Sequence, residues 1–509
     1  MNIVSAKEEI KRTVEIYLDR NETGEYVIPY MKQRPIFLIG APGIGKTAVV
    51  EQVAAELDLG LVAYSMTHHT RQSAIGLPFI SERDYGGAKT RISEYTMSEI
   101  IASVYDMMER TGKDKGILFL DEINCVSETL SPAILQFLQY KTFGNHFLPK
   151  GWVIVSAGNP PQYNRSVREF DIATRDRLKC ISIEEDYEVW RKYAYDNHIH
   201  SSITAFLEVN RNWFYSIKTT AEGAQFATAR GWEDMSFAIK EYEKKQFPVD
   251  MTLISQYITD LDIARKYTVY YDLYKKYRED YKVDSILDGT YVQLIEERAR
   301  NAEFDERIAL VEMIFDALNM QFTDVMEKRA ILENTADVLR DVRQKAKKRS
   351  GRYVVFEILE KKITEINTDL ENRKNSNSIM PEQYRIIKGS TELLCSFTGT
   401  ESDTGDDRKD FPYIKKKFDS CAVKQDKEAK ETGKELDNTF SFMEKVWPNG
   451  RELRYFMTIL TAGRHSSSFI AGYGCDAYYR HNDDMLLYDV REELKREITL
   501  ELEGEATPD

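Results

Sequence analysis

Residues 40–47 read Gly-Ala-Pro-Gly-Ile-Gly-Lys-Thr, which is the complete G-x-x-x-x-G-K-[ST] pattern. The apolar run Pro35–Ile39 precedes this stretch and has the length of a strand, and residues 48–57 follow it with a helical pattern. A strand, a glycine-rich loop and a helix N-terminus place successive backbone N–H groups around a phosphate. The stretch therefore predicts an α/β unit that binds the phosphates of a nucleotide.

The residues of this loop have separate expected roles. The ammonium group of Lys46 is expected to reach the β- and γ-phosphates, and the hydroxyl of Thr47 is expected to ligate Mg²⁺. ATP and Mg²⁺ are therefore the predicted ligands. The residues predicted to contact the nucleotide at this loop are Gly40, Pro42, Gly43, Gly45, Lys46, Thr47 and Ala48.

A second apolar strand ends in two acids about 75 residues after the loop. Residues 116–124 read Gly-Ile-Leu-Phe-Leu-Asp-Glu-Ile-Asn, and ligands of parallel sheets gather at the carboxyl ends of the strands. Asp121 is predicted to hold Mg²⁺ through its water shell. Glu122 is predicted to orient and deprotonate the water that attacks the γ-phosphate.

A third apolar strand, residues 152–157, is followed by Gly-Asn-Pro-Pro at 158–161. Asn-Pro-Pro by itself indicates only a turn. Its position after the first two motifs places the amide of Asn159 beside the nucleotide, where it can orient the attacking water.

The order of these motifs, followed by Asp176-Arg177-Leu178, resembles that of an AAA+ ATPase. Within that superfamily the chain most resembles the MoxR-like group of the helix-2-insert clade, over approximately residues 1–245. Residues 72–79 and 83–87 resemble the insert that interrupts the second helix in that clade. Residues 141–149 resemble the hairpin that precedes the asparagine strand.

The resemblance also implies roles for residues outside the phosphate loop. Asn159 matches the first sensor, and Arg230 matches the second sensor, which opens a lid helix and reads the nucleotide. Arg177 lies where the family places an arginine finger, which acts across a subunit interface. The family usually has an aromatic residue where this chain has Leu178, and Arg175 is an alternative finger. For either arginine, a surface salt bridge is the other interpretation.

The predicted fold class is α/β. Residues 1–184 are expected to form the P-loop AAA+ core with a parallel sheet, and residues 185–245 a helical lid. Residues 246–509 are expected to form a mostly α-helical C-terminal extension, with polar breaks near 372–382 and 398–410. We expect this extension to dock clients or a partner and to be dispensable for binding ATP.

The extension shows clear helical periodicity over residues 252–282 and 305–348, and residues 354–370 indicate a further helix. One helix face of the first segment is lined by Tyr267, Tyr270, Tyr271, Tyr274, Tyr277 and Tyr281. These rings either form an aromatic surface for a partner or pack on a neighbouring helix with their hydroxyls at the rim. The packing interpretation is favoured.

Composition restricts the remaining function classes. The formal net charge of the 509 residues is −14, which disfavours a nucleic-acid motor because duplex binding depends on Lys and Arg facing phosphates. The best basic stripe, residues 340–349, is interpreted as a solvated helix face. Five scattered cysteines and the lack of an apolar run of about 18 residues indicate a cytoplasmic protein with reduced thiols and no membrane span.

The resemblance implies a homo-oligomeric ring, a hexamer, that uses ATP to remodel or mature a protein client. Proteins of this group commonly work with a partner that carries a von Willebrand factor A domain. Because this chain has no D-x-S-x-S metal motif of its own, that partner would be separate. The rival classes are a nucleotide-gated assembly scaffold with incidental turnover and, less favoured, a nucleic-acid motor.

Overall fold

The chain forms two compact units in a computed structural model. Unit 1 comprises Met1–Val189 and Asn334–Asp410, and unit 2 comprises Trp190–Glu333 and Phe411–Asp509. The structure describes residues 1–68, 74–86, 88–163, 167, 169–220, 223–347, 354–398, 407–448 and 450–483. Several residues of the predicted features, namely 72, 73, 87, 348, 349 and 399–406, lie outside this described set.

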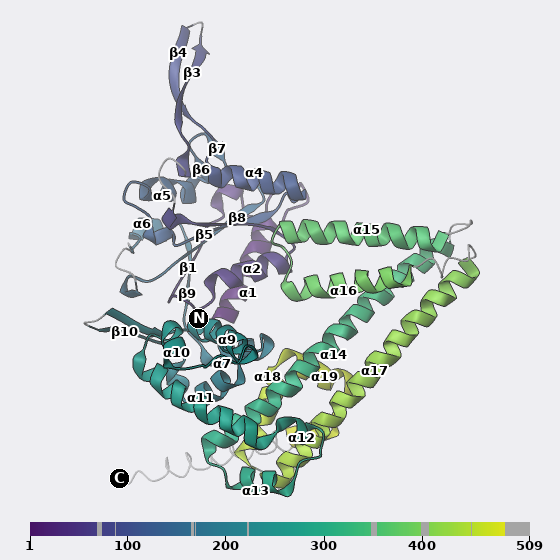
Figure 1. The fold of residues 1–509 in the computed structure, drawn as a ribbon. Coiled ribbons are helices and arrows are strands. Elements are labelled where there is room, and N and C mark those ends of the chain that lie inside the picture. Colours follow the sequence, from purple (N-terminus) through teal and green to yellow (C-terminus); the bar gives the residue numbers. More distant parts are fainter. Residues whose placement is uncertain are drawn as a thin grey trace, which may run out of the picture. The chain divides into compact units, whose positions relative to one another are not determined.

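A five-stranded parallel sheet lies at the centre of unit 1 (Figure 1), with the strand order β2-β5-β8-β1-β9. Three of these strands lie where the apolar runs predicted them, and the α/β fold class is confirmed. The strands are β1 (Ile36–Gly40), β2 (Gly60–Ser65), β5 (Gly116–Asp121), β8 (Trp152–Gly158) and β9 (Lys179–Ile183).

The two faces of the sheet are covered by different helices because side chains alternate along each strand. In β5, Ile117 and Phe119 pack on one face with α1 and α2, whereas Leu118 and Leu120 pack on the other with α4 and α5. The result is a three-layer α/β/α arrangement. The helices are α1 (Ile3–Leu18), α2 (Lys46–Glu56), α4 (Glu99–Thr111) and α5 (Ser131–Tyr140).

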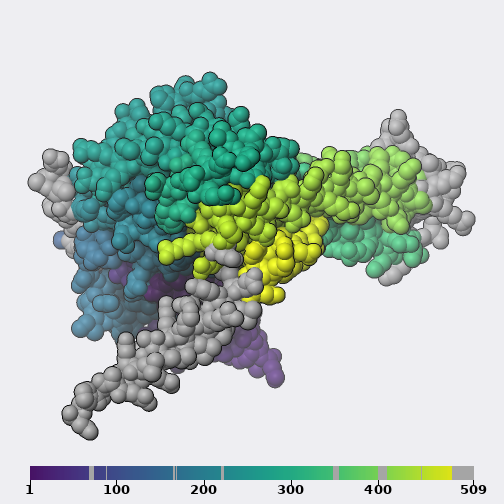
Figure 2. Space-filling model, turned by 90° about the horizontal axis from the view of Figure 1, so that it is seen from below, coloured from purple at the N-terminus to yellow at the C-terminus, as the bar shows by residue number. Residues whose placement is uncertain are grey.

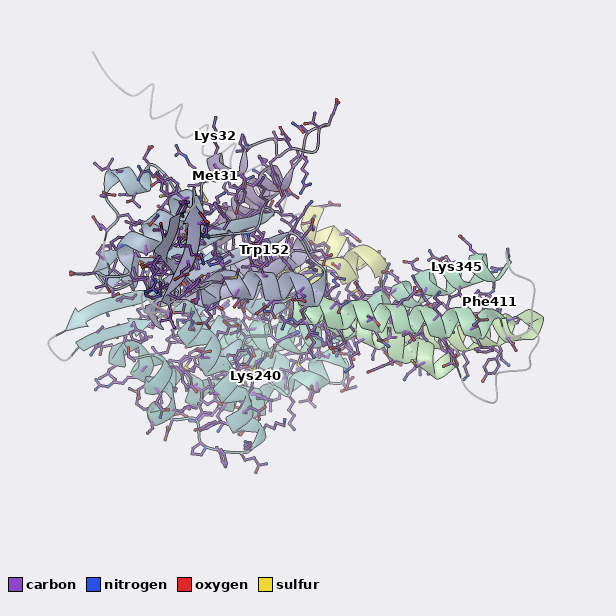
Figure 3. The ribbon with its side chains drawn as sticks, turned by 90° about the horizontal axis from the view of Figure 1, so that it is seen from above. Met31, Lys32, Trp152, Lys240, Lys345 and Phe411 are labelled. Atoms are coloured by element: carbon purple, nitrogen blue, oxygen red, sulfur yellow. The ribbon has the colours of Figure 1, made fainter. Side chains whose placement is uncertain are left out.

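Trp152, labelled in Figure 3, is fully buried at the amino end of the sheet. It is in register with Gly116, which is in turn in register with Gly60. A Cβ on Gly116 would lie 2.6 Å from the indole, and one on Gly60 would lie 3.2 Å from it. The two glycines therefore leave the space that the indole fills.

Two antiparallel hairpins extend from unit 1. The longer, between β2 and α4, pairs β3 (Pro78–Tyr85) with β4 (Ala88–Tyr95) and projects away from the core in Figure 1. The shorter pairs β6 (Thr142–Phe143) with β7 (His146–Phe147) around Gly144, which has a φ of 57°. This second hairpin confirms the one predicted within residues 141–149.

Part of the C-terminal extension belongs to unit 1. Helices α15 (Val354–Asn375) and α16 (Pro381–Phe397) form a helical hairpin. The first predicted polar break therefore contains the end of α15, a tight turn and the start of α16. Unit 1 also contains the short helices η1 (Tyr30–Lys32), η2 (Met66–His68), η3 (Ile123–Cys125), η4 (Pro161–Tyr163) and α6 (Ile172–Arg175).

Unit 2 combines the predicted lid with the rest of the extension, so the expected boundary at residue 245 falls inside it. A β-hairpin of β10 and β11 interrupts the helices of the lid. The first elements are α7 (Tyr187–Asp196), α8 (Ser201–Val209), η5 (Arg211–Trp213), β10 (Ser216–Thr220), β11 (Gly223–Ala227) and α9 (Ala229–Lys244). They are followed by α10 (Met251–Tyr257), α11 (Leu261–Tyr281), α12 (Val283–Leu287) and α13 (Gln293–Asn301).

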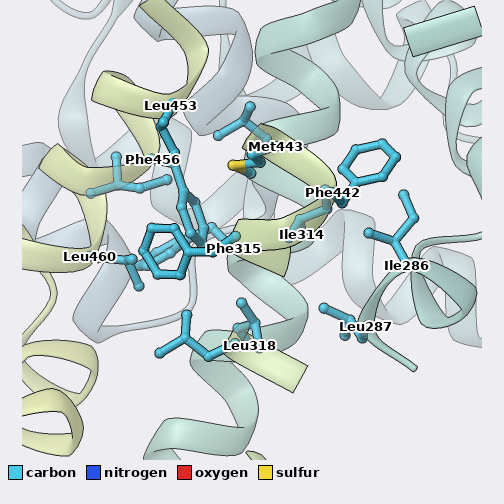
Figure 4. Packing of buried hydrophobic residues seen from close by; sticks show 14 of the residues in the cluster. Ile286, Leu287, Ile314, Phe315, Leu318, Phe442, Met443, Leu453, Phe456 and Leu460 are labelled. Atoms are coloured by element: carbon cyan, nitrogen blue, oxygen red, sulfur yellow. The ribbon is translucent and has the colours of Figure 1, made fainter. Parts of the chain in front are cut away.

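The core of unit 2 is built on two long helices, α14 (Phe304–Lys347) and α17 (Asp407–Val446). Figure 4 shows Phe315 of α14 packed among Phe456 and its neighbours from α18. The C-terminal helices are α18 (Arg451–Ala462) and α19 (Arg464–Tyr473). Only Gly463 separates α18 from α19.

Within unit 2, α14 and α17 lie side by side (Figures 1 and 2), and polar pairs join them. The side-chain amide of Gln321 donates to Glu435 at 2.5 Å, and Lys328 donates to Glu428 at 2.8 Å. Among the described residues of both units, no helix is both long and apolar enough to cross a membrane.

The tyrosine face of α11 packs inside unit 2, which confirms the packing interpretation. The hydroxyls do not lie at the rim, however. Tyr267 and Tyr274 pair with the hydroxyls of Ser202 and Ser201 at 2.6 and 2.7 Å, and Tyr271 donates to Glu243 at 2.8 Å. Ser201 and Ser202 of α8 and Glu243 of α9 thus supply hydrogen-bond partners for these three buried hydroxyls. Among the described residues, the buried hydroxyl of Tyr270 on the same face has no hydrogen-bond partner.

Glu312 is a carboxyl buried in the same unit, on α14. It accepts hydrogen bonds from Tyr195 and Thr204, both at 2.8 Å, and from Tyr455. Burial raises the pKa of Glu312 to about 7, although the three hydroxyl donors oppose this shift. The nearby Glu208 raises the pKa further.

We expect unit 2 to lose stability as the pH rises between about 4.5 and about 7, because the folded state binds the Glu312 proton more tightly than the unfolded state does. The loss from this carboxyl is on the order of 3 kcal/mol. In Glu312→Gln that loss should disappear. The free energy of unfolding is measured by urea denaturation at pH 5 and at pH 8. Hydrogen exchange of the α14 amides at the same two pH values reports the change in unit 2. Glu333→Gln, an exposed change on the same helix, is the control and should keep the wild-type pH dependence.

Candidate functional site

The loop after β1 has a backbone that only glycine adopts readily. Gly43 has a φ of 75° and Gly45 a φ of 92°, and both values lie in the left-handed region. A Cβ on Gly40 would lie 2.6 Å from the carbonyl oxygen of Ile183 in β9. The glycines therefore allow the chain to turn tightly between β1 and the N-terminus of α2. Pro42 lies within the loop, and Ala48 is exposed in the first turn of α2.

Lys46 connects this loop to the end of β8. Its ammonium group donates to the carbonyl oxygens of Gly40 and Ala41 at 2.9 and 2.8 Å, and to Oδ1 of Asn159 at 2.9 Å. The Lys46 side chain is held among carbonyl and amide oxygens, and the residue is only 9% exposed. The structure thus brings the predicted phosphate-binding lysine and the predicted first sensor into direct contact.

Thr47 and Asp121, the two residues predicted to bind Mg²⁺, are in contact. The hydroxyl of Thr47 donates to Oδ2 of Asp121 at 3.1 Å, and Oδ1 of Asp121 accepts the N–H of Glu122 at 2.9 Å. Hydroxyl and carboxylate oxygens are the ligands that Mg²⁺ prefers, so these residues fit the ion. Bound Mg²⁺ would supply charge neutralisation for the phosphates.

Glu122 follows Asp121 in a left-handed backbone conformation with a φ of 54°, which is uncommon for a residue with a side chain. Its carboxylate accepts hydrogen bonds from Thr67 at 3.1 Å and from Ser65 at 3.4 Å. We did not predict either residue from the sequence. Ser65 could have been found, because it ends a strand that is adjacent to β5 and is in register with Asp121.

Asn124 is the third residue that the sequence analysis missed. Its side-chain amide donates to the backbone carbonyl of Asn159 at 2.8 Å, and the residue is buried. A Cβ on Gly158 would lie 2.3 Å from Oδ1 of Asn124, so the glycine before Asn159 leaves room for the amide. Asn124 therefore fixes the segment that carries Asn159.

Arg175 and Arg177 lie on the surface directly before β9, while Leu178 is buried in the core. Within the described residues, the ion pair at this place joins Arg34 to Asp176 at 4.0 Å, and neither predicted finger takes part in it.

These arginines lie at the amino end of the sheet. Lys179 is in register with Ile36 at the start of β1, whereas Ile183 is in register with Gly40 at the phosphate loop. Four residues of strand, about 13 Å, separate the two ends. The structure therefore does not bring either arginine together with Lys46 of the same chain.

Arg230 belongs to unit 2. It is exposed in the first turn of α9. The side chain of Thr228 caps this helix by accepting the N–H of Gly231 at 3.2 Å. The predicted start of a lid helix at this arginine is thus present.

Residues 35–178 match the family model described as the AAA domain of the dynein-related subfamily. This segment is an AAA domain. The domain begins immediately before β1 and ends after Arg177, so it contains the loop, the Asp-Glu strand and Asn159. Domains of this kind generally bind and hydrolyse nucleotides. A comparison with curated proteins gave no match.

The contact between Thr67 and Glu122 leads to a prediction. In Thr67→Val the carboxylate loses its shorter hydrogen bond and becomes less well oriented, so we expect kcat for ATP hydrolysis to fall about tenfold with little change in KM. Thr67→Ser keeps the hydroxyl and should remain near wild type. Steady-state phosphate release measures both variants. An unchanged kcat in Thr67→Val would show that this contact does not orient the base.

Proposed function

We propose that the chain is a MoxR-like AAA+ ATPase that hydrolyses ATP in a homo-oligomeric ring to remodel or mature a protein client. The observation that carries this proposal is the meeting of Lys46, Thr47, Asp121, Glu122 and Asn159 at the carboxyl end of one parallel sheet. These residues come from three separate strand ends, and each has the chemistry that phosphoryl transfer needs.

In this mechanism each residue has one task. The loop N–H groups and Lys46 bind the phosphates of ATP. Glu122 accepts the proton of the attacking water, and Asn159 orients that water through its amide. The hydrogen bonds from Thr67 and Ser65 hold the carboxylate of Glu122 in one orientation, and a preoriented acceptor lowers the reorganisation needed during the reaction.

A ring is supported by the position of the surface arginines. Arg175 and Arg177 precede the start of β9, and about 13 Å of strand separates that start from the end of β9 that is in register with the phosphate loop of the same chain. Both exposed side chains are therefore placed to contact the loop of a neighbouring copy. Arg177, or Arg175 in its place, would then stabilise charge on the γ-phosphate of that neighbour. A hexamer is the proposed ring size. Arg230 is the proposed second sensor, which reads the nucleotide from the lid.

The MoxR-like assignment is supported by the two hairpins of unit 1. The β3–β4 hairpin lies where the resemblance places the insert, and the β6–β7 hairpin precedes the strand that ends at Asn159. We further propose a cytoplasmic location and a separate partner with a von Willebrand factor A domain. The net charge of −14 disfavours nucleic acid as the substrate.

The proposal is tested with wild type, Glu122→Gln and Lys46→Ala. ATP should assemble the wild type and Glu122→Gln, but not Lys46→Ala, into a ring seen by light scattering. Glu122→Gln should then capture a client in a pull-down that depends on ATP. Assembly on ATP without turnover by the wild type would instead identify a nucleotide-gated scaffold.

A further inference from the structure

The turn between α15 and α16 covers the edge of the sheet that carries the ATPase site. β2 is an outermost strand and has a strand neighbour, β5, on one side only. Such a strand leaves backbone N–H groups without a strand partner. The N–H of Leu61 in β2 donates to the carbonyl oxygen of Ser376 at 3.2 Å, and Ser376 is fully buried. At this point the turn takes the place of a further strand.

The backbone conformation of the turn leaves two carbonyl groups available to accept hydrogen bonds from residues outside the helix. Asn377 has a φ of 50°, the left-handed conformation that ends many helices. The N–H of Ser378 donates to the carbonyl of Arg373 at 2.9 Å, as in a Schellman motif. In this arrangement the carbonyls of Asn375 and Ser376 have no partner within the helix.

Donors from the end of α4 and from the connection between α4 and β5 satisfy polar groups of the turn. Arg110, at the end of α4, donates to the carbonyl of Asn375 at 2.8 Å. Lys113 donates to the hydroxyl of Ser378 at 2.5 Å and to the carboxylate of Asp58 at 2.8 Å. Asp58 lies in the connection from α2 to β2. The amino end of β2 is therefore attached to the turn directly at Leu61, and indirectly through Lys113, which contacts both Asp58 before β2 and Ser378 of the turn.

The opposite end of β2 holds the base of the reaction. Ser65 ends the strand and Thr67 follows it, and both donate to the carboxylate of Glu122. Between these ends β2 is paired with β5 at every residue from Gly60 to Ser65. A displacement of the strand at Leu61 is consequently passed to the residues that orient Glu122.

We propose that residues 373–378 are a positioning element of the ATPase site. They fix β2 against β5 and thereby set the orientation of Glu122 through Thr67, without touching the nucleotide. This inference rests on the proposed ATPase function and deepens it, because it gives the C-terminal extension a part in turnover rather than in ATP binding.

The main test uses the full chain with Arg110→Ala and Lys113→Ala combined. The double variant should lower kcat for ATP hydrolysis by roughly tenfold, while Kd for ATP stays within about twofold because the phosphate loop is intact. In a Thr67→Val background the same double change should lower kcat no further. This non-additivity is expected only if both changes act through one path, and a general loss of stability would not produce it.

A second pair of variants changes only the backbone preference of the turn. Asn377 is exposed, and Asn377→Val disfavours its left-handed conformation, whereas Asn377→Gly permits it. We expect faster hydrogen exchange at the Leu61 amide and a lower kcat in Asn377→Val, and recovery of both in Asn377→Gly. Lys388→Ala, which removes an exposed ion pair with Glu392 elsewhere on α16, is the surface control and should match the wild type.

Two results would overturn the positioning role. One is an unchanged kcat in both the Arg110/Lys113 and the Asn377→Val variants, and the other is an equal fall of kcat with and without Thr67. Failure of the proposed function looks different, because the wild type itself would then release no phosphate. In that case the exchange of Leu61 would still report whether the turn holds β2, but no role in turnover would remain.

Discussion

Glu122→Gln is expected to bind ATP as tightly as the wild type and to lose nearly all turnover. The amide keeps the size of the side chain and can still meet Thr67, but it cannot accept the proton of the attacking water. General base catalysis typically contributes about 10²–10⁴ in rate, so kcat should fall by that factor. Phosphate release together with equilibrium binding of a fluorescent ATP analogue measures the two effects separately.

Lys46→Ala is the matched variant, and it should lose the ATP binding that Glu122→Gln retains. It removes the ammonium group that bridges the loop carbonyls and Asn159, and with it the charge that faces the phosphates. We expect ATP binding itself to be lost. Turnover in Glu122→Gln at the wild-type rate would contradict the assignment of the base, and tight ATP binding by Lys46→Ala would contradict the phosphate site.

Arg177→Ala should leave ATP affinity nearly unchanged and cut hydrolysis by about 10³–10⁵, the range known for arginine fingers. The physical reason is that Arg177 lies at the end of the sheet opposite its own phosphate loop. In the proposed ring it would therefore stabilise the transition-state charge in a neighbouring copy rather than bind the ATP of its own chain. Binding and phosphate release are measured on the assembled protein.

A mixing experiment tests the subunit interface directly. Arg177→Ala supplies an intact phosphate loop, and Lys46→Ala supplies an intact finger. Lys46→Ala does not assemble alone, but ATP bound to the Arg177→Ala copies should assemble mixed rings, which should recover part of the activity. Arg175→Ala is the control for the neighbouring guanidinium. A larger loss with Arg175→Ala would change only which residue is the finger, whereas full activity from a strictly monomeric chain would contradict the ring.

Local sequence patterns were sufficient for much of the site. The phosphate loop, the Asp-Glu strand end and the asparagine strand end each lie within a few consecutive residues, and a strand followed by a polar turn has few alternative structures. Parallel strands place their carboxyl ends at one edge of a sheet. For this reason the order of the motifs predicted that Lys46, Thr47, Asp121 and Asn159 lie around one nucleotide site, although their direct contacts with one another are seen only in the structure.

Sequence patterns were less informative about burial, because the same residues can form either a solvent-exposed or a buried structure. The tyrosine spacing on α11 predicted a packed face, but the burial of the hydroxyls depended on Ser201 and Ser202 facing them from α8. Similarly, the polar composition of residues 372–382 predicted a break between helices. That composition does not distinguish a solvated loop from a turn whose polar groups are buried against another element.

The sequence by itself determined the nucleotide-binding loop, the α/β class and the helices of the extension, because these depend on local propensity and on hydrophobic period. Only the tertiary structure decided that Thr67 and Ser65 hold Glu122, that Arg177 lies at the end of the sheet away from its own loop, and that the turn at Ser376 closes the edge of β2. Each of these contacts joins residues far apart in the chain. They depend on strand order and register, which are set by the packing of both sheet faces and which no short stretch of sequence encodes.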